Sequence, residues 1–134
     1  MEGTFSESAT ILVVDDDRDN AVIVRDLLEA HGYTVFVARD GDEGLAMFEE
    51  VRPALVLLDI MMPGRSGWEV CHAMKQHPTH GRNVRVIMLT ALSAWNDKQA
   101  AIQTGADDYV TKPVDLGGLL SCVKRNLALV GPPA

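Results

Sequence analysis

Several carboxylates in this chain stand directly after short apolar runs, which is an unusual place for charge. A first run, residues 10–14, leads straight into Asp15 and Asp16, and a second, residues 54–58, is followed at once by Asp59. Apolar runs of this length are typical of strands buried on both faces of a parallel sheet. Carboxylates brought together at one sheet edge repel one another and raise each other's pKa unless a cation lies between them. The pattern therefore indicates a metal-assisted phosphate site.

Two further predicted strands end in groups that could bind a phosphoryl group. Residues 84–89 lead into Thr90, and residues 108–111 lead into Lys112. If all these runs are parallel strands, their carboxyl ends share the edge where open α/β folds bind ligands. That edge would carry an acidic cluster, a lone carboxylate, a hydroxyl and an ammonium group.

Taken together, the motifs at these strand ends resemble a known family. They are Val-Val-Asp15-Asp16, Leu-Leu-Asp59-Ile-Met-Met-Pro63-Gly, Leu-Thr90-Ala91 and Gly105-Ala-Asp-Asp-Tyr-Val-Thr-Lys112-Pro113. Each motif alone is weak, but in this order they closely resemble the receiver domain of two-component response regulators, the CheY-like domains. The resemblance covers roughly residues 10–130. It implies a flavodoxin-like α/β fold, (βα)5 and doubly wound, with a five-stranded parallel sheet in the order 2-1-3-4-5.

The elements that must position this edge alternate regularly along the chain. Alternation of strand and helix with short loops predicts right-handed crossovers with helices on both faces of the sheet. The predicted strands are 10–14, 34–38, 54–59, 84–89 and 108–111, and the predicted helices are 21–31, 41–51, 66–76, 95–104 and 115–129. The strand order itself rests on the resemblance. We expect a flexible extension over 1–9, the receiver domain over 10–130, and a tail or the start of a linker over 131–134.

The resemblance assigns the metal and phosphoryl chemistry to particular residues. Asp59 would be the phosphoryl acceptor, because a carboxylate nucleophile forms an acyl phosphate. Mg²⁺, which prefers oxygen ligands in octahedral geometry, would be held by Asp16 directly and by Asp15 through a water molecule. Asp59 and the backbone carbonyl of Met61 would complete the protein ligands. Asp17 is interpreted as a helix-start residue rather than a ligand.

Three further residues have roles implied by the resemblance. Lys112 is expected to pair with Asp59 and then with a phosphoryl oxygen, as a compact and mobile charge. Thr90 is expected to donate its hydroxyl to the phosphoryl group. Tyr109 would then rotate from an outward to an inward position, although a static, partly buried strand aromatic fits the sequence as well.

Composition narrows the class of protein. The chain has 134 residues, which predicts one domain, and no apolar stretch approaches the length of a membrane span. The first residues lack the features of a signal peptide, so we expect a cytoplasmic protein in which Cys71 and Cys122 are reduced, buried thiols. A net charge of −7 argues against direct binding of nucleic acid.

The predicted function is a phosphoacceptor signalling switch with Mg²⁺ as cofactor. The phosphoryl donor would be a histidine kinase or a histidine phosphotransfer protein, and the target would be a downstream protein or an output domain, with room for a phosphorylation-dependent dimer. No external metabolite is expected, so the chain would not be an enzyme in that sense. The alternatives are a phosphorylation-independent docking module and the receiver fragment of a longer regulator or hybrid kinase. An aspartyl-phosphate phosphatase is disfavoured because Met61 stands where a second carboxylate would be required.

Overall fold

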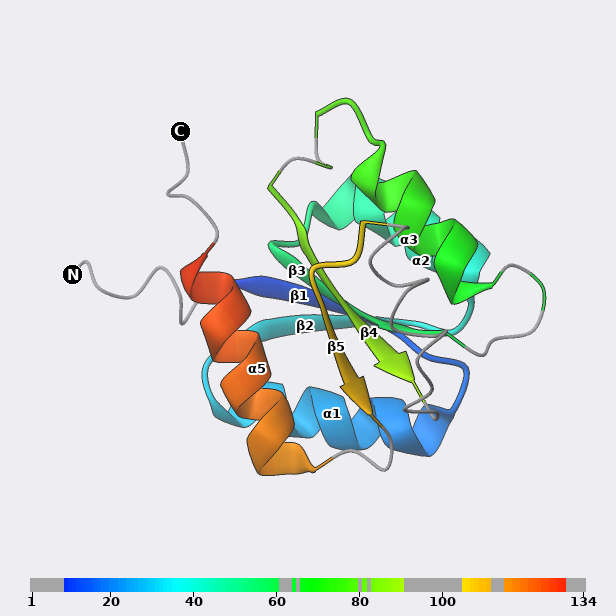
Figure 1. The fold of residues 1–134 in the computed structure, drawn as a ribbon. Helices are drawn as coiled ribbons and strands as arrows, with labels where there is room; N and C mark the ends of the chain where they lie inside the picture. The colour runs from blue at the N-terminus through cyan, green and yellow to red at the C-terminus, as the bar shows by residue number, and fades with distance from the viewer. Residues whose placement is uncertain are drawn as a thin grey trace.

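Five parallel strands form a single sheet at the centre of the molecule (Figure 1). The computed structural model describes residues 9–60, 64, 66–79, 81, 83–90, 105–111 and 115–129. The strand order is β2-β1-β3-β4-β5, which confirms the predicted flavodoxin-like topology. The strands are β1 (Thr10–Val14), β2 (Thr34–Ala38), β3 (Leu55–Asp59), β4 (Arg85–Thr90) and β5 (Asp108–Thr111).

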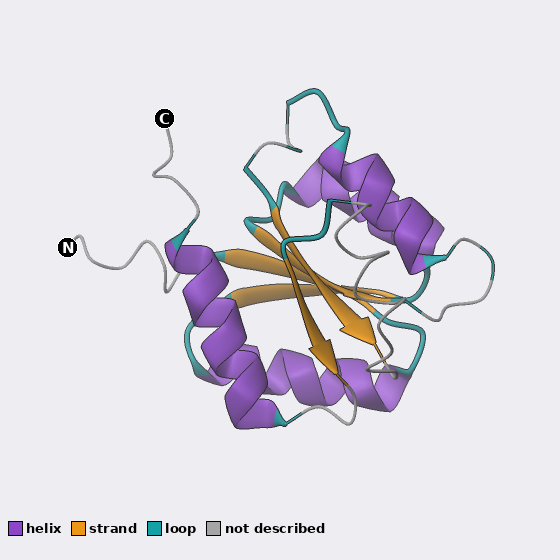
Figure 2. Ribbon diagram, in the orientation of Figure 1, coloured by secondary structure: helices purple, strands orange, loops and turns teal. Residues whose placement is uncertain are grey.

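Helices cover both faces of this sheet. In Figure 2, α2 and α3 lie on one side of the strands, and α1 and α5 lie on the other. Their bounds are α1 (Arg18–Ala30), α2 (Gly41–Val51), α3 (Gly67–Lys75) and α5 (Leu116–Ala128). None of these described helices is long and apolar enough to cross a membrane. The helix predicted over 95–104 lies outside the described residues.

The start of α1 shows how one carboxylate sets a helix boundary. The helix begins at Arg18, earlier than the predicted start, because the Asp17 side chain accepts a hydrogen bond from the backbone N–H of Asn20 at 3.2 Å. A side-chain oxygen at the N-cap satisfies a donor that the helix itself leaves without a partner. The interpretation of Asp17 as a helix-start residue is confirmed.

The central strands are buried on both faces, and alternate side chains fill two separate cores. Leu12 packs into the core beneath α2 and α3, whereas Ile11 packs into the core beneath α1 and α5. Every residue of β3 is buried, including Asp59 at its end. The two cysteines are free and buried, as predicted, one in each core. Because both faces of the sheet are packed against helices, the acidic residues of these segments lie at the strand ends, where Asp15 follows β1 and Asp59 ends β3.

The buried face of α5 combines apolar residues with one polar residue. Leu119, Val123 and Leu127 face the core, whereas Leu116 in the first turn is 39% exposed. The buried face also includes polar Asn126, which is only 1% exposed. A buried amide requires hydrogen-bond partners.

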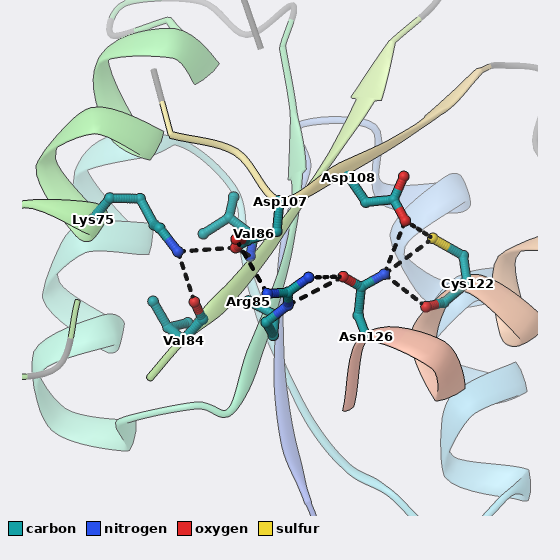
Figure 3. Close-up of polar contacts among 8 residues, drawn as sticks. All are labelled: Lys75, Val84, Arg85, Val86, Asp107, Asp108, Cys122 and Asn126. Atoms are coloured by element: carbon teal, nitrogen blue, oxygen red, sulfur yellow. Dashed lines mark hydrogen bonds and ion pairs between the residues drawn. The ribbon is translucent and has the colours of Figure 1, made fainter. Parts of the chain in front are cut away.

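Those partners form a chain of polar contacts across the amino ends of β4 and β5, shown in Figure 3. The Asn126 Oδ1 accepts from Arg85 Nε at 3.2 Å and from its Nη2 at 3.0 Å, and the Asn126 Nδ2 donates to Asp108 at 3.0 Å. Arg85 also pairs with Asp107 at 3.4 Å, and Lys75 donates to Asp107 at 2.9 Å. This polar chain attaches α3 and α5 to the sheet at the edge opposite the strand carboxyl ends.

The polar chain makes stability depend on pH through Asp108. Burial favours the neutral acid, but hydrogen bonds from Asn126, Arg125 and the Tyr109 N–H outweigh it and hold the pKa of Asp108 below its ordinary value. The folded protein therefore binds this proton less tightly than the unfolded chain does. Asp108 stabilises the fold above the ordinary carboxyl pKa of about 4, and this contribution is lost as the pH falls below that value.

We expect Asp108→Asn to lower the free energy of unfolding by about 1–3 kcal/mol at neutral pH, since it removes hydrogen bonds to a charged group. The difference from the wild-type chain should shrink in acid, where Asp108 itself becomes neutral. Urea unfolding at a series of pH values measures both. A difference that stayed constant from neutral to strongly acidic pH would show that ionisation of Asp108 contributes nothing.

Candidate functional site

Three carboxylates converge at the carboxyl edge of the sheet. One oxygen each from Asp15, Asp16 and Asp59 lies within 4.8 Å of the others. The register of the sheet explains this, because Val14 pairs with Leu58 and the next residue of each chain segment is an aspartate. Asp15 is 1% exposed and Asp59 is 3% exposed, whereas Asp16 is exposed. The site thus combines two buried carboxyl groups with one that faces solvent.

The donor set of this acidic cluster fits a hard divalent cation. Among the described residues it is the one group of three or more potential metal ligands that come together, and all its ligand atoms are carboxylate oxygens. Oxygen ligands suit Mg²⁺, whereas softer metals are selected by thiolate or imidazole groups. Carboxylates at this separation repel one another, and a divalent cation among them offsets that repulsion.

The end of β4 lies beside Asp59. Asp59 pairs with Leu89 across the sheet, so Thr90 follows immediately at the same edge. The Thr90 side chain, Lys112 and Met61 lie outside the residues whose side chains the structure describes, and their predicted roles stay predictions.

Tyr109 is a partly exposed residue of β5. It pairs with Met88 of β4, and its side chain is 37% exposed. Its backbone N–H donates to the Asp108 carboxylate at 2.9 Å, which links it to the polar chain. The predicted rotation of the ring is a change between two states, and it stays a prediction.

Sequence reasoning missed Asn20, which contacts the acidic cluster. Its Nδ2 donates to Asp15 Oδ2 at 2.6 Å, while the backbone N–H of Asp17 donates to Asp15 Oδ1 at 2.9 Å. Both carboxylate oxygens of Asp15 are therefore hydrogen-bonded within the first turn of α1. The only signal in the sequence is an asparagine one helical turn after the N-cap, where it would ordinarily be exposed.

Gly67 was also missed, and it controls the backbone that carries Asp59. Its N–H donates to the carbonyl of Ile60 at 3.1 Å, and the Ile60 N–H donates to the Leu89 carbonyl at 3.1 Å. A Cβ atom at Gly67 would lie 2.4 Å from the Asp59 carbonyl oxygen and 2.7 Å from the Ile60 Cα. The close approach of α3 to the end of β3 therefore requires glycine. Ser66 and Glu69 form a capping box that fixes where α3 begins.

A doubly wound sheet with an acidic cluster at the carboxyl end of its central strands is the arrangement expected of a receiver domain. In agreement, the sequence profile of the response regulator receiver domain matches residues 11–124. The chain belongs to this family, whose members are phosphoacceptor signalling domains of two-component systems.

Solved structures of receiver domains resemble the chain over most of its length. The signal receiver domain of a signal transduction histidine kinase from Syntrophus aciditrophicus is 35% identical, with a TM-score of 0.86, and the match covers 95% of this chain and 96% of that one. The chemotaxis protein CheY4 of Vibrio cholerae is 30% identical, with a TM-score of 0.84 and coverage of 88% and 98%. A CheY-like response regulator receiver domain protein from Methanospirillum hungatei is 34% identical, with a TM-score of 0.81 and coverage of 90% and 94%.

Proposed function

We propose that this chain is a phosphoacceptor switch in which Asp59 receives a phosphoryl group from a phosphohistidine. The donor is a histidine kinase or a histidine phosphotransfer protein. The observation that supports this most directly is the convergence of Asp15, Asp16 and Asp59, one oxygen of each within 4.8 Å of the others. A buried carboxylate at a strand end, beside two others, is unfavourable in a purely structural role and useful in phosphoryl transfer.

The transfer needs a nucleophile, a leaving group and charge neutralisation. An oxygen of Asp59 attacks the phosphorus atom, and a P–O bond forms as the P–N bond to the donor imidazole breaks. The electron pair of the broken bond stays on the imidazole nitrogen. The product is an acyl phosphate. Its hydrolysis by water returns the Asp59 carboxylate and inorganic phosphate, so the chain acts on its own side chain and on no metabolite.

Mg²⁺ is the cofactor that we assign to this site. Asp16 would bind it directly and Asp15 through water, with Asp59 and the backbone carbonyl of Met61 as further ligands. Bound Mg²⁺ supplies positive charge to the transferring phosphoryl group and to the carboxylates around it. Lys112 adds a second positive charge on the phosphoryl oxygens, and the Thr90 hydroxyl adds a hydrogen-bond donor.

Phosphorylation changes the charge of the edge, and that change is the signal. A phosphoryl group adds about −1.5 to −2 charges and three acceptor oxygens. The Thr90 hydroxyl moves toward those oxygens, and Tyr109 rotates inward into the space that this leaves. The two conformations differ in their contact with a target protein, an output domain or a second copy of the chain. The shift in the equilibrium between the two conformations is limited by the difference in how favourably each one interacts with the phosphoryl group.

A phosphorylation-independent docking module is the second candidate. It is less well supported, because a module that only docks has no use for a cluster of mutually repelling carboxylates.

The relatives named above include a chemotaxis protein and a receiver domain of a histidine kinase. A separate switch protein and a receiver within a longer regulator or hybrid kinase are both compatible with the proposed chemistry.

The proposed function is tested by intact mass after incubation with acetyl phosphate. We expect the chain to gain one phosphoryl group in the presence of Mg²⁺ and almost none when EDTA removes divalent cations. Addition of excess Mg²⁺ to the EDTA sample should restore the gain, which serves as the control. Equal labelling with and without Mg²⁺ would contradict the metal site. If neither acetyl phosphate nor a phosphohistidine donor labels the chain, the docking module is the better account.

A further inference from the structure

The contact between Asn20 and Asp15 is a short side-chain hydrogen bond inside the acidic cluster. The Asn20 Nδ2 lies 2.6 Å from Asp15 Oδ2. Asn20 is itself held in place, because its backbone N–H donates to Asp17 Oδ1 at 3.2 Å. Asp15 is almost completely buried, at 1% exposed. The bond therefore joins a buried ligand candidate to the first turn of a helix.

The two hydrogen bonds to Asp15 orient its carboxylate without occupying all the lone-pair positions on its oxygens. Among the residues that the structure describes, one donor reaches each oxygen, from Asn20 and from the Asp17 backbone. A carboxylate has about four lone-pair positions on its two oxygens, so positions remain for a cation or for water bound to a cation. An amide donor also carries no charge. It restrains the carboxylate and leaves in place the negative charge that attracts a cation. A lysine or arginine side chain would instead neutralise that charge.

We propose that Asn20 is a positioning residue that makes the acidic cluster selective for Mg²⁺ over larger divalent cations. The inference rests on the cation site of the proposed function. Mg²⁺ requires near-ideal octahedral geometry at about 2.0–2.1 Å, whereas Ca²⁺ accepts six to eight oxygens at about 2.3–2.6 Å in flexible arrangements. Asp15 would hold Mg²⁺ through a water molecule, so an Asp15 carboxylate fixed at one angle fixes the position of that water, which matters more for Mg²⁺ than for Ca²⁺. Residues that orient metal ligands in this way commonly change affinity by about 10–100-fold.

The test is cation affinity rather than phosphorylation. Thermal unfolding of the full chain, titrated with MgCl₂ or with CaCl₂, reports each dissociation constant because a ligand that binds only the folded state raises Tm. In Asn20→Ala the dissociation constant for Mg²⁺ should rise roughly ten-fold, with a much smaller change for Ca²⁺. The isosteric Asn20→Asp keeps the shape but replaces the donor with an acceptor. It should also lose the preference for Mg²⁺, because the extra oxygen favours Ca²⁺.

Asn126→Ala is the matched control. It removes the same amide from the polar chain at the opposite edge, where Asn126 bonds Arg85 and Asp108. We expect it to lower Tm without changing the ratio of Mg²⁺ to Ca²⁺ affinity. An unchanged ratio in Asn20→Ala, with normal Mg²⁺ binding by the wild-type chain, would overturn the positioning role alone. Absence of any Mg²⁺ effect on the wild-type chain would overturn the cation site as well.

Discussion

Asp59→Ala and Asp59→Asn proteins should gain no phosphoryl group from acetyl phosphate under conditions in which the wild-type chain gains one. Asp59 is buried at the end of β3, and it meets Asp15 and Asp16 at the carboxyl edge of the sheet. Asparagine has nearly the same size and shape but lacks the negative oxygen that attacks phosphorus. Loss of labelling in both variants would therefore report the missing nucleophile rather than a change of shape. Intact mass measures the outcome directly.

Asp26→Asn is the control for this experiment. Asp26 is an exposed residue of α1 whose side chain pairs with Arg25 and is not a member of the acidic cluster. The same substitution there should leave the gain of one phosphoryl group unchanged. Fragmentation of the wild-type product should place the added mass on the peptide that contains Asp59. Full labelling of Asp59→Asn would show that another residue accepts the phosphoryl group.

Gly67→Ala should be among the most damaging single-methyl changes in the described part of the chain. The added Cβ would lie 2.4 Å from the carbonyl oxygen of Asp59, so α3 or the end of β3 must move. Overpacking of this kind typically costs about 1–3 kcal/mol. Because the atom that it displaces belongs to the backbone of Asp59, the proposed phosphoryl acceptor, we also expect phosphorylation by acetyl phosphate to slow. Urea unfolding and the rate of mass gain measure the two effects.

Gly117→Ala is a matched comparison on another helix. Gly117 lies in the first turn of α5, and a Cβ there would meet nothing within 4 Å. Alanine in a helix is more favourable than glycine by up to about 1 kcal/mol, so this variant should be at least as stable as the wild-type chain. If Gly67→Ala proved as harmless as Gly117→Ala, the close approach of α3 to Asp59 would not matter for the fold or the site.

Local sequence patterns were sufficient to predict the central strands β1 and β3, since apolar runs are typical of strands buried on both faces. Apolar periodicity was less informative for α5, which carries leucines on more than one side. There the structure buries Leu119 and Asn126 and leaves Leu116 partly exposed. Burial of Asn126 depends on Arg85 and Asp108, which are distant in sequence, and no local pattern reveals such partners.

In the site, too, some residues can be predicted from the local sequence, whereas others can be identified only from the folded structure. Asp15, Asp16 and Asp59 could be predicted because each stands at the end of an apolar run and matches a family motif. The roles of Asn20 and Gly67 could not, because they depend on a side-chain distance and on how closely a helix approaches a strand. Residues of common types at unremarkable positions acquire their importance only from the packing around them.

Among the described residues, the side-chain hydrogen bonds that join α5 to the sheet lie toward one end of the helix, and this restricts how the helix can move. Its side-chain bonds to β4 and β5 gather near Asn126, in the C-terminal half of the helix, whereas Asp115 begins the helix at the other end. A displacement that preserved those bonds would leave the Asn126 end of α5 in place and would have to move the first turn together with the buried Leu119. The exposed Leu116 side chain lies in that turn. Such a displacement would change the position of Leu116 more than that of Asn126, because the buried amide would be its fixed point.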